Sequence, residues 1–160
     1  MALARFRHRR CSTLSAIPTI RSLSKDELSA HVEAFIDIAR DVDGEYWGRT
    51  HFLQELTDKW QLSLAAWLEN RPVGYAILSR KSSHRAHLHH FMMAADQRGR
   101  GLGGRMLEAA IERCIQQGCT EITLKVVASN QAGSRFYRRH GFENAGHDKD
   151  YDLMRRTLAL

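Results

Sequence analysis

The chain has 160 residues, of which 43% are hydrophobic and 26% are charged, a composition typical of one globular domain. No apolar run comes near the roughly 20 residues that a membrane-spanning helix needs, and the basic N-terminus lacks the apolar core of a secretory signal. The net charge of +6 indicates an anionic partner, and it suits nucleic acid as well as a phosphorylated cofactor.

The cysteines and the basic N-terminus bear on the setting of the protein and on its boundaries. Cys11, Cys114 and Cys119 form neither an even set nor a Cys-x-x-Cys pair, which indicates reduced thiols and a cytoplasmic protein. We expect residues 1–16 to be a flexible basic tail and residues 17–160 to form a single domain without repeats.

The periodicity of the chain predicts alternating strands and helices. In chain order we expect a strand at residues 17–23, a helix at 24–38, a shorter helix at 49–60, strands at 62–68, 73–79 and 85–93, a helix at 101–117, a strand at 121–127, a helix at 130–140 and a strand at 151–158. Ser24 and Glu27 match a capping box at the first helix, and Gly118 suits a C-terminal cap. The pattern predicts an α/β domain with a mixed, mostly antiparallel sheet of six or seven strands and about four helices on its two faces.

The stretch Asp96–Leu107 places four glycines and three arginines at the start of an expected helix. Glycines let the backbone approach a phosphate closely, and unpaired N–H groups at a helix start bind anions. Gly99, Gly101 and Gly104 have the spacing of a dinucleotide-binding turn. That turn follows its strand almost at once, however, and needs a carboxylate after the next strand. Here "AADQR" intervenes and the next strand ends "KVVASN", which argues against a dinucleotide fold.

Two motifs, in order, resemble the GNAT superfamily of N-acetyltransferases. The family's cofactor loop, Gln/Arg-x-x-Gly-x-Gly/Ala, is matched by Arg98, Gly101 and Gly103. "NQAGSRFYRRHGF" is similar to the family's Asn-x-x-Ala-x-x-(Leu/Phe)-Tyr-x-x-x-Gly-Phe, with Gly133 in place of alanine, a departure that we expect to be sterically mild. The resemblance covers Ile17–Leu158 and implies a V-shaped cleft between the fourth and fifth strands.

The resemblance implies acetyl-CoA as co-substrate. The loop amides and two arginines would hold the pyrophosphate, while the end of the fourth strand would pair with the pantetheine arm as if it were another strand. A backbone N–H there would polarise the thioester carbonyl. The expected cofactor-binding residues are Phe91, Met92, Met93, Arg98, Gly99, Arg100, Gly101, Leu102, Gly103, Gly104 and Asn130.

A tyrosine and two histidines are the candidate catalytic residues. Tyr137 lies where the family has the general acid that protonates the departing thiolate, and the alternative is a core aromatic. His87 and His89 are two apart on a strand and so are expected on one face with Phe91, while His90 points away. This segment resembles the arylalkylamine acetyltransferases, whose two histidines relay a proton through water. An ordinary imidazole pKa of about 6.5 suits such a base; the alternative is a polar lining without catalysis.

Other catalytic arrangements fit the sequence less well. The ribosomal-protein N-terminal acetyltransferases use a glutamate on the fifth strand, where this chain has Lys125. A zinc site needs a third convergent ligand, so no metal is expected. We expect neither a membrane nor a nucleic acid as partner, and the sequence leaves a homodimer open.

The predicted function is transfer of an acetyl group from acetyl-CoA to a primary amine of a small molecule. The alternatives are a peptide N-terminal or lysine acetyltransferase and a non-catalytic acyl-CoA-binding module. The acidic residues Asp37, Asp41, Asp43 and Glu45 lie between the first two helices. We interpret them either as a solvated loop or as a group that attracts a cationic amine.

Overall fold

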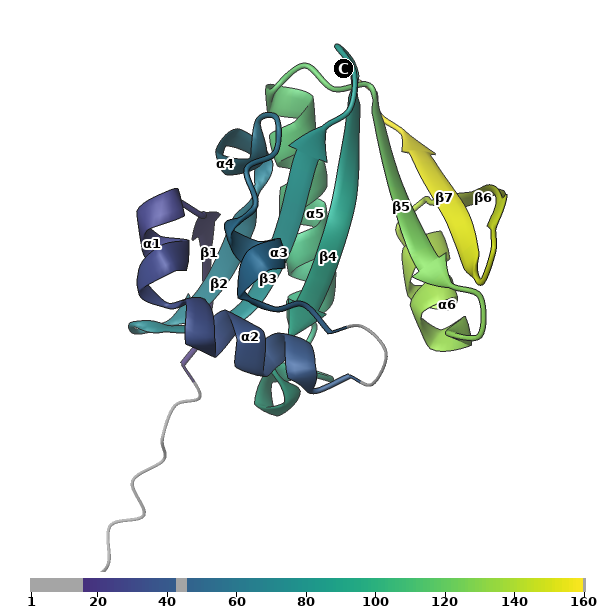
Figure 1. The fold of residues 1–160 in the computed structure, drawn as a ribbon. Coiled ribbons are helices and arrows are strands. Elements are labelled where there is room, and N and C mark those ends of the chain that lie inside the picture. Colours follow the sequence, from purple (N-terminus) through teal and green to yellow (C-terminus); the bar gives the residue numbers. More distant parts are fainter. Residues whose placement is uncertain (1–15, 43–45, 160) are drawn as a thin grey trace, which may run out of the picture.

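A computed structural model describes residues 16–42 and 46–159 and contains one seven-stranded sheet in the order β1-β2-β3-β4-β5-β7-β6 (Figure 1). β4 and β5 run parallel, and every other neighbouring pair is antiparallel. The strands are β1 (Thr19–Ser22), β2 (Leu64–Leu68), β3 (Arg71–Arg80), β4 (Arg85–Met93), β5 (Glu121–Val127), β6 (Glu143–Asp148) and β7 (Tyr151–Thr157). The predicted mixed, mostly antiparallel sheet is confirmed.

Helices cover both faces of the sheet. They are α1 (Lys25–Ala30), α2 (Val32–Arg40), α3 (Arg49–Leu53), α4 (Lys59–Leu62), α5 (Leu102–Gln116) and α6 (Gln131–Arg139), with a 3-10 turn at Ala95–Gln97. In the view of Figure 1, α2 and α3 lie in front of the sheet and α5 lies behind it. The front layer packs through the buried rings of Phe35, Phe52 and Tyr75, whose centroids are 5.2–5.9 Å apart. No helix within residues 16–42 and 46–159 is long and apolar enough to cross a membrane.

The two helices predicted before β2 are each divided in two. The capping box is confirmed, since the Glu27 amide donates to Ser24 Oγ at 3.1 Å, but the helix breaks at His31. The helix predicted at residues 49–60 is interrupted at residues 54–58. There the buried ammonium of Lys59 donates to the carbonyl oxygens of Phe52 and Gln54 at 2.5 and 2.6 Å. A continuous helix would bond those carbonyls to its own amides, so the lysine stabilises the interruption.

Strand β6 has no counterpart among the segments expected from the sequence. Its residues, "ENAGHD", are mostly exposed and show no alternation of apolar and polar side chains. Gly146 has a φ of 139°, and the pairing with β7 is irregular between Asn144 and Gly146. An edge strand of this kind is specified by pairing with β7 rather than by a hydrophobic face.

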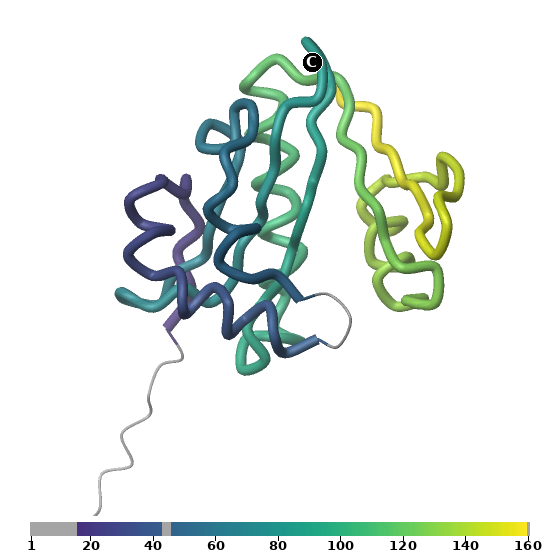
Figure 2. Tube along the Cα trace, viewed as in Figure 1, coloured from purple at the N-terminus to yellow at the C-terminus, as the bar shows by residue number. Residues whose placement is uncertain are grey.

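The sheet is split between its two parallel strands. Residues Arg85–Leu88 of β4 pair with Glu121–Leu124 of β5, and beyond this point the strands diverge, as the traces show (Figure 2). From His90 to Met93, β4 is paired on its β3 side only, among the described residues. One edge of β4 therefore presents backbone groups to the split.

A β-bulge in β4 changes which side chains share a face. Ile77 of β3 pairs with His90 and the next residue, Leu78, pairs with Leu88, so His89 is an extra residue on β4. Two successive residues at a bulge project to the same side. His89 and His90 therefore both lie on the face of Tyr75, and the prediction that His90 points away is wrong.

Candidate active site

A cavity of about 650 Å³ occupies the split. Its walls come from β4, β5, α6 and the segment that follows α2. It is lined by Val42, Tyr46, Trp47, His87, Leu88, His89, His90, Phe91, Met92, Met93, Arg98, Leu124, Lys125, Val126, Asn130, Gly133, Phe136, Tyr137 and Tyr151. The cavity thus collects the candidate catalytic residues and five of the eleven candidate cofactor-binding residues. The stretch Gly99–Gly104 is not part of this lining, and Gly101 and Gly104 line a second pocket beside His140.

The four glycines at the start of α5 divide into two pairs. Gly99 and Gly101 have φ values of 72° and 81°, which glycine adopts without the steric cost that other residues incur. Gly103 and Gly104 face the α6 segment, where an added Cβ would lie 3.7 Å from Phe136 and 3.5 Å from His140, at ordinary van der Waals distance. The first pair shapes a turn whose following N–H groups suit an anion, and the second brings α5 close to α6.

Arg98, expected at the pyrophosphate, is held by two partners. Its Nε donates to the carbonyl oxygen of Met93 at 3.2 Å, and its Nη1 lies 2.8 Å from Asp41 Oδ2. Asp37 lies 4.0 Å from Arg40, while Asp43 and Glu45 are outside the described residues. The two described carboxylates of the acidic stretch are therefore each near an arginine of this chain.

Phe91 faces the α5–α6 side of the sheet. Its ring centroid lies 5.9 Å from that of Phe136 and 6.3 Å from that of Tyr137, and its pairing partner is Ala76. Because of the bulge, the prediction that Phe91 shares a face with His87 and His89 is wrong. Phe91 consequently reaches the cavity from one face of the sheet, and the histidines reach it from the other.

Tyr137 is half-buried among aromatic rings while still lining the cavity. Its centroid is 5.3 Å from Phe136 and 5.7 Å from Phe142. The helix that carries it begins at Asn130, whose Oδ1 accepts from the Gly133 amide at 2.9 Å. A Cβ on Gly133 would lie 2.6 Å from Asn130 Nδ2. An alanine there would require the end of the Asn130 side chain to shift, so glycine at this position is compatible with the observed cap.

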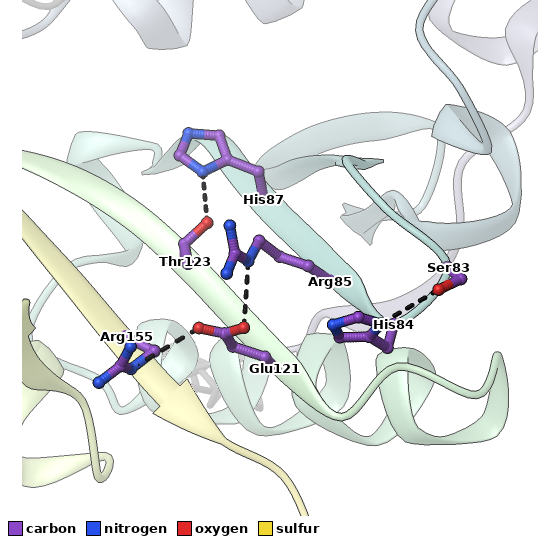
Figure 3. Close-up of polar contacts among 7 residues, drawn as sticks. All are labelled: Ser83, His84, Arg85, His87, Glu121, Thr123 and Arg155. Carbon is purple, nitrogen blue, oxygen red and sulfur yellow. Dashed lines mark hydrogen bonds and ion pairs between the residues drawn. The ribbon is translucent and has the colours of Figure 1, made fainter.

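His87 and His89 lie together, as predicted, with ring centroids 4.8 Å apart. A hydroxyl group holds each ring: Thr123 Oγ1 is 2.8 Å from His87 Nδ1 (Figure 3), and Ser79 Oγ is 2.6 Å from His89 Nε2. In the same view Glu121 connects Arg85 of β4 with Arg155 of β7, at 3.0 and 3.6 Å. These contacts tie three strands together where the sheet is still closed.

Both histidines titrate far below the range expected for an ordinary imidazole. Burial, followed by the positive charges of Lys81 and Lys125, lowers the pKa of His87 to about 4. Burial, followed by His87, Lys81 and Lys59, lowers the pKa of His89 to about 4. At neutral pH both rings are uncharged. They can accept a proton in passing, but they do not retain it as a base of pKa 6.5 would.

Several residues of the site were not singled out from the sequence. His90 stacks on Trp47 and on Tyr75, with centroids 4.8 and 5.6 Å away, and Tyr75 Oη lies 2.6 Å from His90 Nδ1. Ser79 follows a run of apolar residues in β3, which was the available signal, whereas Thr123 stands between Glu121 and Lys125 in the alternating pattern of β5. Their partners depend on strand pairing, and no pattern within one strand specifies that.

The split sheet, the cavity that holds the histidine pair and Tyr137, and the glycine turn at the start of α5 are features expected of an acetyltransferase fold. A family model described as "Acetyltransferase (GNAT) family" matches residues 25–142. The match covers well over half of the chain, and the protein belongs to this family.

A relative and two solved structures illustrate the similarity. The uncharacterized N-acetyltransferase MJ1207 of Methanocaldococcus jannaschii is 28% identical over 142 residues, covering 78% of this chain and 60% of that protein. The ribosomal-protein-S18-alanine N-acetyltransferase of Escherichia coli has a TM-score of 0.76 at 21% identity, covering 90% of this chain and 96% of that one. The PaiA N-acetyltransferase of Thermoplasma acidophilum, solved with coenzyme A, has a TM-score of 0.70 at 19% identity, covering 89% and 99%. At these identities the two structures show a shared fold.

Proposed function

We propose that the protein transfers an acetyl group from acetyl-CoA to a primary amine of a small molecule by direct attack in a ternary complex. The observation that carries this proposal is the cavity at the β4–β5 split, which brings the histidine pair and Tyr137 together with Phe91, Met93 and Arg98 of the expected donor set. Family membership and the coenzyme A bound to the Thermoplasma relative support the choice of donor.

The donor side of the cavity is proposed to bind acetyl-CoA through backbone groups. The turn at Gly99 and Gly101 would hold the pyrophosphate at the start of α5. The edge of β4 from His89 to Met93, paired with no other strand of the described chain on this side, would bond the pantetheine arm. An N–H group of the same edge would stabilise the oxyanion that forms when the thioester is attacked.

The reaction requires one proton to leave the amine and one to reach the thiolate. The neutral amine attacks the thioester carbon, a C–N bond forms, and the C–S bond breaks. Tyr137 would donate its phenolic proton to the departing sulfur. The proton from the amine would pass through water along His87 and His89 toward solvent, because rings with a pKa of about 4 release it readily.

The substitution Tyr137→Phe tests the proposed general acid. Removing a general acid lowers turnover by about 10²-fold or more, while acetyl-CoA affinity, measured by calorimetry, should change little. Tyr151→Phe is the matched control, because Tyr151 is another tyrosine that lines the cavity and is 41% exposed. Equal activity of both variants would mean that Tyr137 is not the general acid and serves only in packing.

An acetyl-CoA consumption screen tests the acceptor class. Small primary amines and short peptides with free N-termini are compared at equal concentrations, with release of coenzyme A as the readout. We expect the small amines to be the better acceptors. Preferential turnover of peptides would favour the peptide acetyltransferase, and acetyl-CoA binding without turnover on any acceptor would favour a non-catalytic module.

A further inference from the structure

Lys125 of β5 lies at the point where β4 and β5 separate. The pairing of β4 with β5 ends at Leu88 and Leu124, so Lys125 is the first residue of β5 beyond it. Alternation along a strand places Lys125 on the same face as Thr123, whose hydroxyl holds His87. Lys125 lines the cavity, and its charge contributes to the lowered pKa of His87. The ammonium group therefore belongs to the histidine side of the cavity.

The described lining of this cavity is cationic. Within residues 16–42 and 46–159 it includes Arg98 and Lys125 and no aspartate or glutamate. Arg98 is engaged at the donor side, by Met93 and Asp41, and the imidazoles of His87 and His89 are neutral at pH 7. Lys125 is consequently the charge that an acceptor meets on the histidine side.

The ammonium of Lys125 is accessible and has donor capacity for a ligand. Its Nζ donates to Asp148 Oδ2 at 2.7 Å, and the two side chains are 45% and 49% exposed. An ammonium group has three N–H donors, and this contact uses one of them. A half-exposed ion pair of this kind contributes little stability, so the lysine can contact a second anion at low cost.

We propose that Lys125 determines acceptor specificity by binding a carboxylate of the acceptor, so that the preferred substrates are amino acids or related amines that carry an anionic group. This inference rests on the proposed function. A diamine would bring a second cation toward Lys125 without a described carboxylate in the lining to balance it. The alternative of a cationic acceptor relies on Asp43 and Glu45, since Asp37 and Asp41 lie beside Arg40 and Arg98.

The test compares acceptors that differ only in their carboxylate. Leucine, leucinamide and 3-methylbutylamine form one matched set, and lysine with cadaverine forms another. For each acceptor the kcat/KM of Lys125→Met is divided by that of the unmodified protein, so differences in amine pKa cancel. We expect a loss of about tenfold or more for leucine and lysine, mainly through KM, as for a lost charge-assisted hydrogen bond. For the amide and the decarboxylated amines the change should stay within about twofold.

Two further variants separate a local contact from a general electrostatic effect. Lys81→Met removes a cation that also acts on His87 but does not line the cavity, and it should leave the preference for a carboxylate unchanged. Asp148→Asn removes the competing anion and should raise kcat/KM for leucine several-fold. Acetyl-CoA affinity should be the same in all three variants.

The possible failures are distinguishable. The specificity proposal is overturned if Lys125→Met loses activity equally for all acceptors, or if the unmodified protein prefers cadaverine over lysine. Either result leaves the proposed acetyltransferase activity unaffected. If the preference for cadaverine disappears in the double variant Asp43→Asn, Glu45→Gln, the acidic stretch selects the acceptor instead. Absence of turnover with every amine and peptide overturns the proposed function itself.

Discussion

His87 and His89 are the residues whose chemistry depends most on their surroundings. Each ring is held by a hydroxyl group on a neighbouring strand and is half-buried at the wall of the cavity. Burial and nearby lysines lower both pKa values to about 4. The pair is thus in its proton-accepting form across the whole neutral range, and its proposed role is to conduct a proton rather than to store one.

The double variant His87→Ala, His89→Ala tests this role through the pH profile. Loss of the relay should lower kcat at pH 7 by about tenfold or more and should matter less at higher pH, where more of the amine is already neutral. Thr123→Val is the control, because it removes the hydroxyl partner of His87 and keeps both rings. A profile of the double variant that overlays that of the parent would eliminate the relay.

Helix α5 shows how one element serves both binding and packing. Its first turn follows Gly99 and Gly101, both at positive φ, and its next two glycines face the α6 segment. At its far end Gly118, with a φ of 79°, ends the helix and donates to the carbonyl oxygen of Ile115 at 3.0 Å. The two ends therefore have glycines of similar conformation and, under the proposal, different roles.

Gly101 and Gly118 provide a matched pair of substitutions. A Cβ added at either glycine would have no other heavy atom within 4 Å. Because both residues are at positive φ, each replacement costs roughly 1–2 kcal/mol of backbone strain. Gly101→Glu should abolish acetyl-CoA binding in calorimetry, because it adds a like charge at the proposed pyrophosphate site. Gly118→Glu should lose similar stability in urea unfolding and retain binding. Equal acetyl-CoA affinity of the two variants would remove the basis for this donor site.

At the scale of the molecule, the two faces of the sheet carry different parts of the proposed site, and both faces are accessible at the split between β4 and β5. Helices α2 and α3 cover the histidine face, and α5 and α6 cover the proposed donor face (Figure 1). The closed end of the split is braced by the ion pairs of Glu121 with Arg85 and Arg155. The cavity beyond it requires two buried imidazoles, which makes the stability of the whole fold depend on pH.

We predict a loss of stability in mild acid. Between pH 6.5 and 4 the unfolded chain binds protons on His87 and His89 while the folded chain does not. Lowering the pH through this window therefore favours unfolding, by at most about 1.4 kcal/mol per pH unit for each ring. Above pH 6.5 the contribution is constant.

Urea unfolding at several pH values between 5 and 6.5 measures this dependence, because most carboxylates remain ionised there. The double variant His87→Asn, His89→Gln should show a flatter dependence than the parent. The single variant His84→Asn, at the exposed start of β4, is the control and should keep the parental slope. A parental slope in the double variant would mean that these rings titrate normally in the fold.

Local patterns in the sequence were sufficient for most of the sheet and for the family. Alternation and turn residues located β4 and β5 with their observed bounds, and two short motifs were sufficient to identify the superfamily. These signals are local: a strand period, a helix cap, or a glycine where the backbone needs a positive φ. They held wherever the structure depends on neighbours within a few residues.

The tertiary structure decided how those residues meet. The two-residue period of a strand predicted Phe91 on the face of the histidine pair and His90 on the other face. The bulge at His89 reverses both assignments. The ion pair of Arg98 with Asp41 and the low pKa values of the histidines likewise come from groups distant in sequence or from burial. Strand register, charge pairing and desolvation are set by which segments pack together, and no window of the chain contains that information.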